Sequence, residues 1–344
     1  MSRDNRIVWA DLLRGMAVFA IVLGHTLRNA TAVYPWLYSF HVPLCVMVSG
    51  IVFSRGIKSF GQYLSDKFRR LMIPYYAFAL VSILLYEIMG NWMEDAVDGG
   101  YSVSFWQNLF GMVYANAGNG LMRWNMPLWY LPMIFVVVIV AWCVYRYDSG
   151  KWDFIVLASS VVVAIVLKTV VRLDGLPMGI ETACYLFPFF ALGKIVQRYR
   201  KLLEGTCVWS KLIAGVCLIT AGTLLSTNNS LISYNADNYG KMGYVYFLTQ
   251  GTLLCVGFSC LAAIKEKSGV IARWLSENTL GIMVMHKFPI LFFVALLPMT
   301  KELVREAPLI GSILIACSSV VLCVVVSNII VKVCPTLLGV RRKM

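Results

Sequence analysis

The chain of 344 residues is 59% hydrophobic and only 14% charged. Soluble globular proteins carry about 25% charged residues, so this composition excludes an ordinary soluble protein and indicates an integral membrane protein. The formal net charge of +13 would suit a nucleic-acid-binding protein if the basic residues formed one patch, but their distribution along the chain argues against that class.

The apolar runs reach about 20 residues, which is the length of a membrane-spanning helix, whereas membrane-spanning strands alternate in polarity over about ten residues. The sequence therefore predicts an all-α, polytopic membrane protein. No polar segment is long enough for a second, soluble domain, so we expect one membrane domain over residues 1–344. Hydropathy predicts ten spans, at residues 7–29, 36–54, 72–90, 127–147, 153–171, 177–197, 209–227, 242–264, 278–298 and 308–333.

The basic residues indicate the orientation of these spans. With the N-terminus inside, most of the 30 lysine and arginine residues fall in the inner connecting segments, as the positive-inside rule requires. We therefore expect both termini to be cytoplasmic and no nucleic acid to be a partner. The ten cysteines are scattered and form no CxxC pair, so we interpret them as packing residues and expect no metal site.

The first span, residues 7–29, carries Asp11, Arg14 and His25. On a helix these three side chains lie near one face, and Arg14 and His25 are about 16 Å apart along the axis. A charged side chain in hydrocarbon costs at least about 2.5–3.5 kcal/mol, so we expect this face to meet protein or a water-filled cavity. Function is the default interpretation of such groups, and the alternative is a structural Asp11–Arg14 pair with a hydrogen-bonded histidine.

The second span begins near His41 on the outer side. A short connection makes antiparallel neighbours of the first two spans, so we expect His41 and His25 to face the same outer cavity. A neutral imidazole can take a proton from a hydroxyl and later return it. In the same span, Ser49 and Gly50 are small residues that permit close approach of another helix.

The inner loop over residues 54–72 is the most basic connection and ends in Arg69 and Arg70, where the third span begins. Arginine matches phosphate oxygens with two parallel hydrogen bonds. The loop is therefore a candidate site for a phosphorylated cytosolic cofactor. The alternative is that its charge serves topology alone.

The two longest outer connections lie at residues 91–126 and 228–241, and the first is expected to hold a short amphipathic helix near Phe105–Tyr114. Polar loops that contain aromatic residues suit carbohydrate contact, and they equally suit ordinary solvated loops.

Four further side chains are weaker candidates for contact with a substrate. Trp129 and Tyr130 lie at the outer interface, where aromatic rings anchor a span or stack on a sugar. Glu181 is a buried acid near the outer start of the sixth span, and His286 lies about two turns into the ninth. A lone histidine in a helix is more often structural than functional.

Five segments resemble, in order, blocks of the membrane acyltransferase 3 family, and the combination is most similar to its fucose 4-O-acetylase-like branch. They read RIVWADLLRGMAVFAIVLGHT, FHVPLCVMVSGIVFS, KFRRLMIPYY, MPLWYLPMIF and TLGIMVMHKFPI. The resemblance implies a ten-helix enzyme of the cytoplasmic (inner) membrane that moves an acyl group, usually acetyl, from cytosolic acetyl-CoA to a hydroxyl, typically on a cell-envelope polysaccharide.

By position, the resemblance makes His25 the catalytic base or acyl relay, positioned by Arg14 with Asp11. Arg69 and Arg70 match the basic site for the coenzyme, although they are adjacent here rather than spaced as Arg-x-x-Arg.

The sequence thus predicts a membrane-bound O-acetyltransferase, and the alternative is a proton-coupled transporter or flippase of a glycan-related substrate. A transporter would release no free coenzyme A, which distinguishes the two. The expected partners are acetyl-CoA, a carbohydrate acceptor and the lipid bilayer, and a homodimer is left open. The residues that we assign to catalysis are His25, Asp11, Arg14 and His41. We assign Arg69, Arg70 and Arg14 to acetyl-CoA binding, and Trp129, Tyr130, Glu181 and His286 to acceptor binding.

Overall fold

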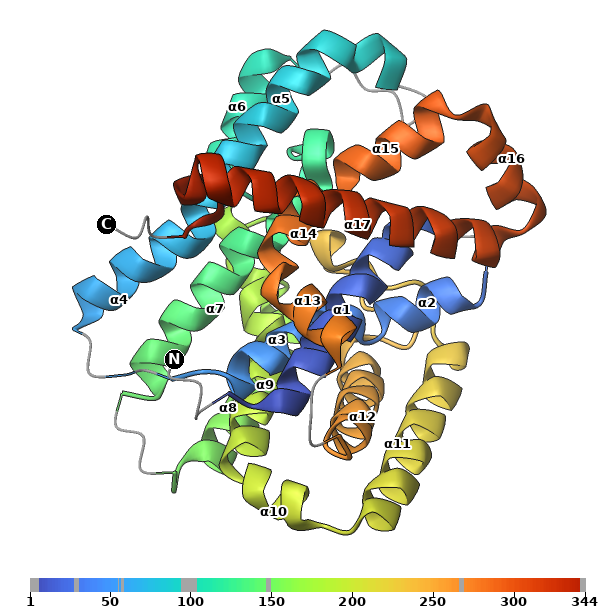
Figure 1. The fold of residues 1–344 in the computed structure, drawn as a ribbon. Coiled ribbons are helices and arrows are strands. Elements are labelled where there is room, and N and C mark those ends of the chain that lie inside the picture. Colours follow the sequence, from blue (N-terminus) through green and yellow to red (C-terminus); the bar gives the residue numbers. More distant parts are fainter. Residues whose placement is uncertain are drawn as a thin grey trace.

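The computed structural model describes residues 6–27, 31–54, 56, 59–93, 104–146, 150–265 and 269–340. Over these residues the chain is helical, and its one β feature is an isolated bridge between Ser233 and Asn238. The predicted all-α fold is therefore confirmed. Figure 1 shows the helices gathered into one bundle, with α11 (yellow) at its edge.

The α-helices are α1 (Val8–Thr26), α2 (Val33–Tyr38), α3 (His41–Ile51), α4 (Phe60–Lys67), α5 (Ile73–Met93), α6 (Phe105–Tyr114), α7 (Tyr130–Val144), α8 (Asp153–Val166), α9 (Ile180–Arg198), α10 (Arg200–Gly205), α11 (Val208–Asn228), α12 (Tyr244–Ala262), α13 (Val270–Glu277), α14 (Thr279–Met285), α15 (Lys287–Leu296), α16 (Pro298–Glu306) and α17 (Pro308–Val333). Shorter π or 3-10 turns are η2 (Phe68–Met72), η3 (Gly118–Gly120), η4 (Arg123–Trp129), η5 (Leu167–Val171), η6 (Pro177–Gly179), η7 (Tyr234–Ala236) and η8 (Pro335–Leu338).

Eight helices in the described part of the chain are long and apolar enough to cross a membrane. The chain is therefore a multi-pass membrane protein. Each of the ten predicted spans coincides with helix, and the expected short helix near Phe105–Tyr114 is present as α6. Two predicted spans are not single long helices. The second contains α3, which has only 11 residues, and the ninth is divided at His286 into α14 and α15.

The division of the ninth span has a local cause. Pro289 has no backbone N–H and cannot donate a hydrogen bond to the carbonyl of Met285, so the helical ladder is interrupted beside His286. Hydropathy averaged over the span does not register this interruption, because most residues around it are apolar.

Helix α1 lies inside the bundle. It packs against α3, α12, α13 and α17, and most of its residues are buried. Its outer end is fixed to α17 by a reciprocal pair of hydrogen bonds: the Thr26 hydroxyl donates to the Ser312 carbonyl at 3.1 Å, and the Ser312 hydroxyl donates to the Thr26 carbonyl at 3.0 Å. This pair sets the position of the residue next to it, His25.

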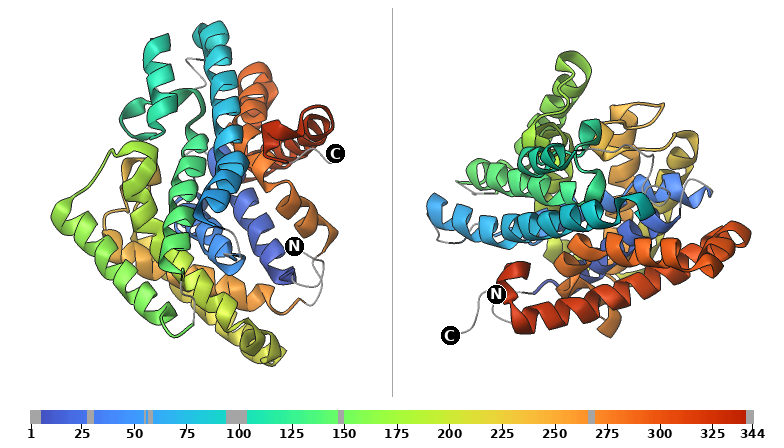
Figure 2. Two further views of the ribbon diagram at one scale, coloured as in Figure 1. Left: turned by 90° about the vertical axis from the view of Figure 1, so that its left-hand side faces the viewer. Right: turned by 90° about the horizontal axis from the view of Figure 1, so that it is seen from above.

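The two ends of the described chain lie at the same end of the bundle. Arg6 and Arg70 line one cavity, and Gly339 packs directly on the backbone of Arg70, where a β-carbon would lie 2.7 Å from its Cα. The right-hand view of Figure 2 shows α17 (red) along one edge of the bundle. This arrangement agrees with the expectation that both termini lie on one side, and we call that side the inner end of the bundle.

Helices α3 and α9 make the closest helix contact that bears on the site. A β-carbon on Gly50 would collide with the carbonyl oxygen of Phe190, and one on Gly193 would collide with the carbonyl oxygen of Met47. The two glycines therefore let each helix rest on the backbone of the other, as small residues do in membrane helix pairs. This confirms the predicted role of Gly50.

The outer loop between α11 and α12 folds back onto the bundle. The Thr182 hydroxyl donates a hydrogen bond to Asp237 at 3.0 Å, and the Lys168 ammonium lies 5.4 Å from the centroid of the Tyr239 ring. Burial raises the pKa of Asp237 to about 7. The loop is therefore held to the bundle around a carboxyl group that binds its proton more tightly than usual.

Replacing Gly50 or Gly193 by alanine should separate α3 from α9. The added methyl group meets backbone, which cannot rotate away, so we expect a cost of about 1–3 kcal/mol and a lower thermal unfolding midpoint in detergent for each variant. The matched control is Gly61→Ala in α4, where a β-carbon meets nothing within 4 Å. Equal midpoints for all three variants would contradict the assigned contact.

Asp237→Asn should change how stability depends on pH. Folding raises the pKa of Asp237. Its contribution to the free energy of unfolding is therefore fully present below about pH 4 and is lost as the pH rises through about 7. Asparagine keeps an oxygen acceptor for Thr182 and never ionises. The thermal midpoint of the wild type should therefore fall relative to the variant between about pH 5 and pH 8. Asp174→Asn, at an exposed carboxylate, serves as control and should track the wild type.

Candidate functional site

A cavity of about 820 Å³ lies at the inner end of the bundle. It is bounded by the start of α1, the end of α3, the α4–η2 segment, α7 and the end of α13. Its polar lining is mostly charged: Arg6, Asp11, Arg14, Lys67, Arg70 and Glu277, with Ser49, Ser54 and Ser276 between them. Four of the six charged side chains are basic, so the cavity suits an anionic ligand.

The structure separates the two adjacent arginines of η2. Arg70 lines the cavity, whereas Arg69 is not among its lining residues. Successive side chains on a helical turn point in different directions, so adjacent residues do not share a face. The backbone of both is covered by Gly339, whose φ of +67° and missing side chain allow this approach.

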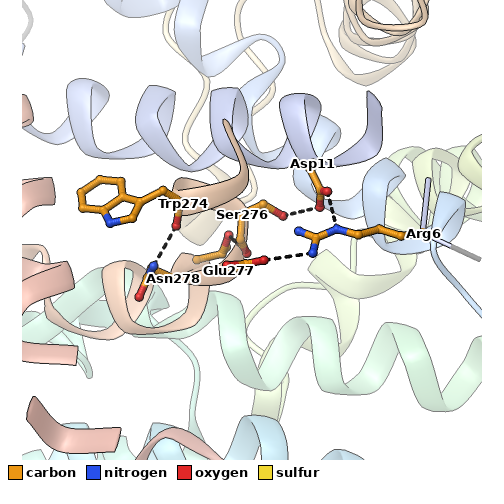
Figure 3. A network of polar contacts seen from close by, with 7 residues as sticks. Arg6, Asp11, Trp274, Ser276, Glu277 and Asn278 are labelled. Atoms are coloured by element: carbon orange, nitrogen blue, oxygen red, sulfur yellow. Dashed lines mark hydrogen bonds and ion pairs between the residues drawn. The ribbon is translucent and has the colours of Figure 1, made fainter. Parts of the chain in front are cut away.

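Asp11 is fully engaged with partners other than Arg14. The Arg6 guanidinium donates to one carboxylate oxygen at 2.6 Å, and the Ser276 hydroxyl donates to the other at 2.7 Å. Arg6 also reaches Glu277 at 2.9 Å, and Figure 3 shows this network joining the start of α1 to the end of α13. The hydrogen bond from Arg6 to Asp11 raises the pKa of Arg6.

The structure therefore corrects the alternative of a self-contained Asp11–Arg14 pair. Asp11 fixes α1 to α13, and Arg14, one turn further along α1, lines the cavity and is only half-buried. Its electrostatic neighbours include Cys45 and Tyr130 as well as Asp11.

Trp129 and Tyr130 were predicted to lie together, and their rings are in edge-on contact, with centroids 6.2 Å apart. The Trp129 ring also stacks on Tyr234 of the outer loop, with centroids 6.2 Å apart and planes 25° apart. The Tyr130 hydroxyl interacts with the side chains of Ser49 and Cys45, near Arg14. Tyr130 thus connects the aromatic contact with the outer loop to the surroundings of Arg14 inside the bundle.

His25 lies in the last turn of α1, about 16 Å along the helix from Arg14. Its ring is half-buried and packs against His286, with centroids 5.2 Å apart. The predicted neighbour, His41, instead packs against Tyr38 and Tyr234, with centroids 4.6 Å and 5.8 Å away. The structure thus pairs His25 with the ninth predicted span rather than with the second.

The tautomers of the other two histidines follow from their hydrogen bonds. His41 Nδ1 lies 2.6 Å from the Leu37 carbonyl, and His286 Nδ1 lies 2.9 Å from the Ile282 carbonyl. A carbonyl only accepts, so Nδ1 carries the proton in each ring and Nε2 carries the lone pair.

Glu181 is almost completely buried and accepts a hydrogen bond from the Asn116 amide at 2.7 Å. This contact ties α9 to the segment before η3, and the structure does not bring Glu181 into contact with the histidine rings. Among the described residues there is no group of three or more His, Cys, Asp or Glu side chains that could hold a metal ion.

Sequence reasoning missed Arg6, Ser276 and Glu277 as members of the inner cavity, whereas Lys67 lies in the loop that was predicted to bind a phosphorylated cofactor. Arg6 was counted only as topological charge. Its position near the inner end of a helix that carries polar residues was a signal of a shared site. Ser276 and Glu277 carried no such signal, because helical periodicity does not tell which helix packs against α1.

Comparison with known proteins shows the family to which the chain belongs. A family model described as an acyltransferase domain, that of the acyltransferase 3 family, matches residues 7–330. Nodulation protein NolL of Sinorhizobium fredii is 24% identical over 289 residues, which cover 77% of this chain and 69% of that protein. No solved structure matches the chain significantly. The chain, with its buried ionisable helix and charged inner cavity, belongs to the acyltransferase 3 family and is a multi-pass membrane acyltransferase.

Proposed function

We propose that this protein is an O-acetyltransferase of the cytoplasmic (inner) membrane that moves an acetyl group from cytosolic acetyl-CoA to a hydroxyl of a cell-envelope carbohydrate. The proposal rests on the difference between the two ends of α1: a basic cavity surrounds its inner end, and a half-buried imidazole lies near its outer end. Donor and acceptor would thus approach the same helix from opposite sides of the membrane.

The inner cavity would receive the phosphate groups of coenzyme A. Arg70 and Lys67 lie on the α4–η2 side of this cavity, and Arg14 lines it from α1. Guanidinium and ammonium groups are the usual protein partners of phosphate. The volume of about 820 Å³ falls within the range of ligand-binding pockets, about 300–1,000 Å³.

The thioester would react near His25. The long arm of the coenzyme can cover the distance of about 16 Å from Arg14 to His25. Ser49 and Tyr130 supply hydroxyl groups beside Arg14 on this route. At His25, an unprotonated ring nitrogen would take the proton of the acceptor hydroxyl while its oxygen attacks the thioester carbonyl.

The acceptor would enter from the outer end, where the half-buried Trp129 stacks on the buried Tyr234 of the outer loop. The partly exposed indole of Trp129 would contact a sugar ring, as expected from the resemblance to the fucose 4-O-acetylase-like branch. Family membership favours acyl transfer over the transporter alternative, because a transporter would leave the thioester intact.

His25→Ala should abolish most of the transfer. General-base assistance contributes about 10²–10⁴-fold, so in washed membranes supplied with acetyl-CoA and acceptor, the acceptor-dependent release of free thiol should fall by at least about 10²-fold. Membrane insertion and the thermal midpoint should stay near those of the wild type, because the ring is only half-buried. Undiminished thiol release would rule out this role for His25.

Arg70→Ala should weaken coenzyme A binding by about three- to tenfold, since the side chain lines the cavity but is largely exposed to solvent. Arg69→Ala removes the same charge one residue away, outside the cavity lining, and is the matched control. Titration of each purified variant with coenzyme A at two salt concentrations measures the difference. A larger loss for Arg69→Ala than for Arg70→Ala would place the coenzyme elsewhere.

A further inference from the structure

The ring of His286 is fully buried and has one nitrogen without a partner. Its exposed fraction is 0%, its Nδ1 donates to the Ile282 carbonyl, and its Nε2 has no hydrogen-bond partner in the structure. Buried polar atoms are nearly always hydrogen-bonded. A sealed imidazole nitrogen with an available lone pair therefore indicates a donor that joins it during function.

The side chain that packs against this ring is that of His25. The two ring centroids are 5.2 Å apart and the planes are tilted by 34°. An in-line N–H···N bond of about 3 Å between two imidazoles also places their centroids roughly 5.2 Å apart, once the distance from each centroid to its nitrogen is added. The spacing for a direct hydrogen bond is thus already present, and rotation of the half-buried His25 ring would align the atoms.

Both rings are held on one scaffold, α17. His25 is next to Thr26, which exchanges two hydrogen bonds with Ser312 of α17. His286 follows α14, where Gly281 approaches so closely that a β-carbon would collide with the Ser327 hydroxyl of α17. Helix packing therefore fixes the backbone positions from which the two imidazoles extend toward each other.

We propose that His286 is a positioning residue for His25: its Nε2 accepts a hydrogen bond from one ring N–H of His25 and so fixes the lone pair of His25 on the other ring nitrogen, which faces the reacting hydroxyl. The hydrogen bond from His286 Nδ1 to the Ile282 carbonyl keeps His286 in the accepting tautomer. In many enzyme active sites a further side chain orients the general base in this way. This inference rests on the proposed acetyl transfer.

In this reaction step His286 neither gains nor loses a proton. The acceptor hydroxyl gives its proton to the free nitrogen of His25 while its oxygen forms a bond to the thioester carbonyl carbon. The carbon–sulfur bond then breaks, and His25 returns the proton to the thiolate of coenzyme A. During the step the His25 ring is positively charged, and the lone pair of His286 stabilises that charge by accepting its second N–H.

The tautomer of His25 can be measured without any reaction. The chain has three histidines, so solid-state NMR of the ¹⁵N-histidine-labelled full chain in lipid resolves each ring. We expect a single tautomer for His25 in the wild type and a mixture in His286→Phe. The matched control is His41→Phe, because His41 also hydrogen-bonds to the carbonyl four residues earlier in the chain but packs on Tyr38 and Tyr234. A tautomer of His25 that is unchanged in His286→Phe would overturn the proposal.

The kinetic test uses two replacements of the same residue. His286→Phe removes the acceptor and should lower kcat by about 10- to 100-fold with KM for acetyl-CoA unchanged, and His286→Gln, which restores an acceptor oxygen, should recover part of the loss. Equal loss in both variants, with a lowered thermal midpoint, would assign His286 a packing role instead. If no acetyl transfer is found in the wild type, the proposed function fails, while the NMR result still decides the pairing of the rings.

Discussion

The cost of carrying Asp11, Arg14 and His25 through hydrocarbon determines the arrangement of the other helices. An isolated charge there costs several kcal/mol, so α1 cannot face lipid. Several helices, α3, α12, α13, α14 and α17 among them, pack around it, whereas α8 and α11 have few buried side chains. The span that carries the ionisable groups thus lies inside the bundle, and the spans with few buried side chains lie at its edge.

The two ends of α1 accommodate their polar groups in different ways. At the inner end, charges neutralise one another: Arg6 joins Asp11 to Glu277, and the remaining cations face a cavity. At the outer end the groups are imidazoles, which need no counter-ion when neutral, and His41 and His286 hydrogen-bond to the carbonyls four residues before them. The inner end is thus suited to holding an anion, and the outer end to exchanging a proton.

The sequence was sufficient for the helical class, the positions of the spans and the polar face of α1, because these depend on local hydropathy and on the helical period. It was not sufficient to predict which helices and side chains contact one another. Periodicity tells which side of a helix is polar, but not which helix will cover it, so Asp11 was associated with Arg14 rather than with Arg6 and Ser276. For the same reason His25 was matched with His41, the nearest histidine along the chain, and not with His286.

The spacing of Arg14 and His25 along α1 has an electrical consequence. The two residues are about 16 Å apart along the helix, roughly half of the 30 Å hydrocarbon layer. A unit charge that crosses the whole membrane gains or loses about 2.3 kcal/mol per 100 mV, so a charge moved from one residue to the other would gain or lose about half of that. A group that moved between them without a charge would avoid this work.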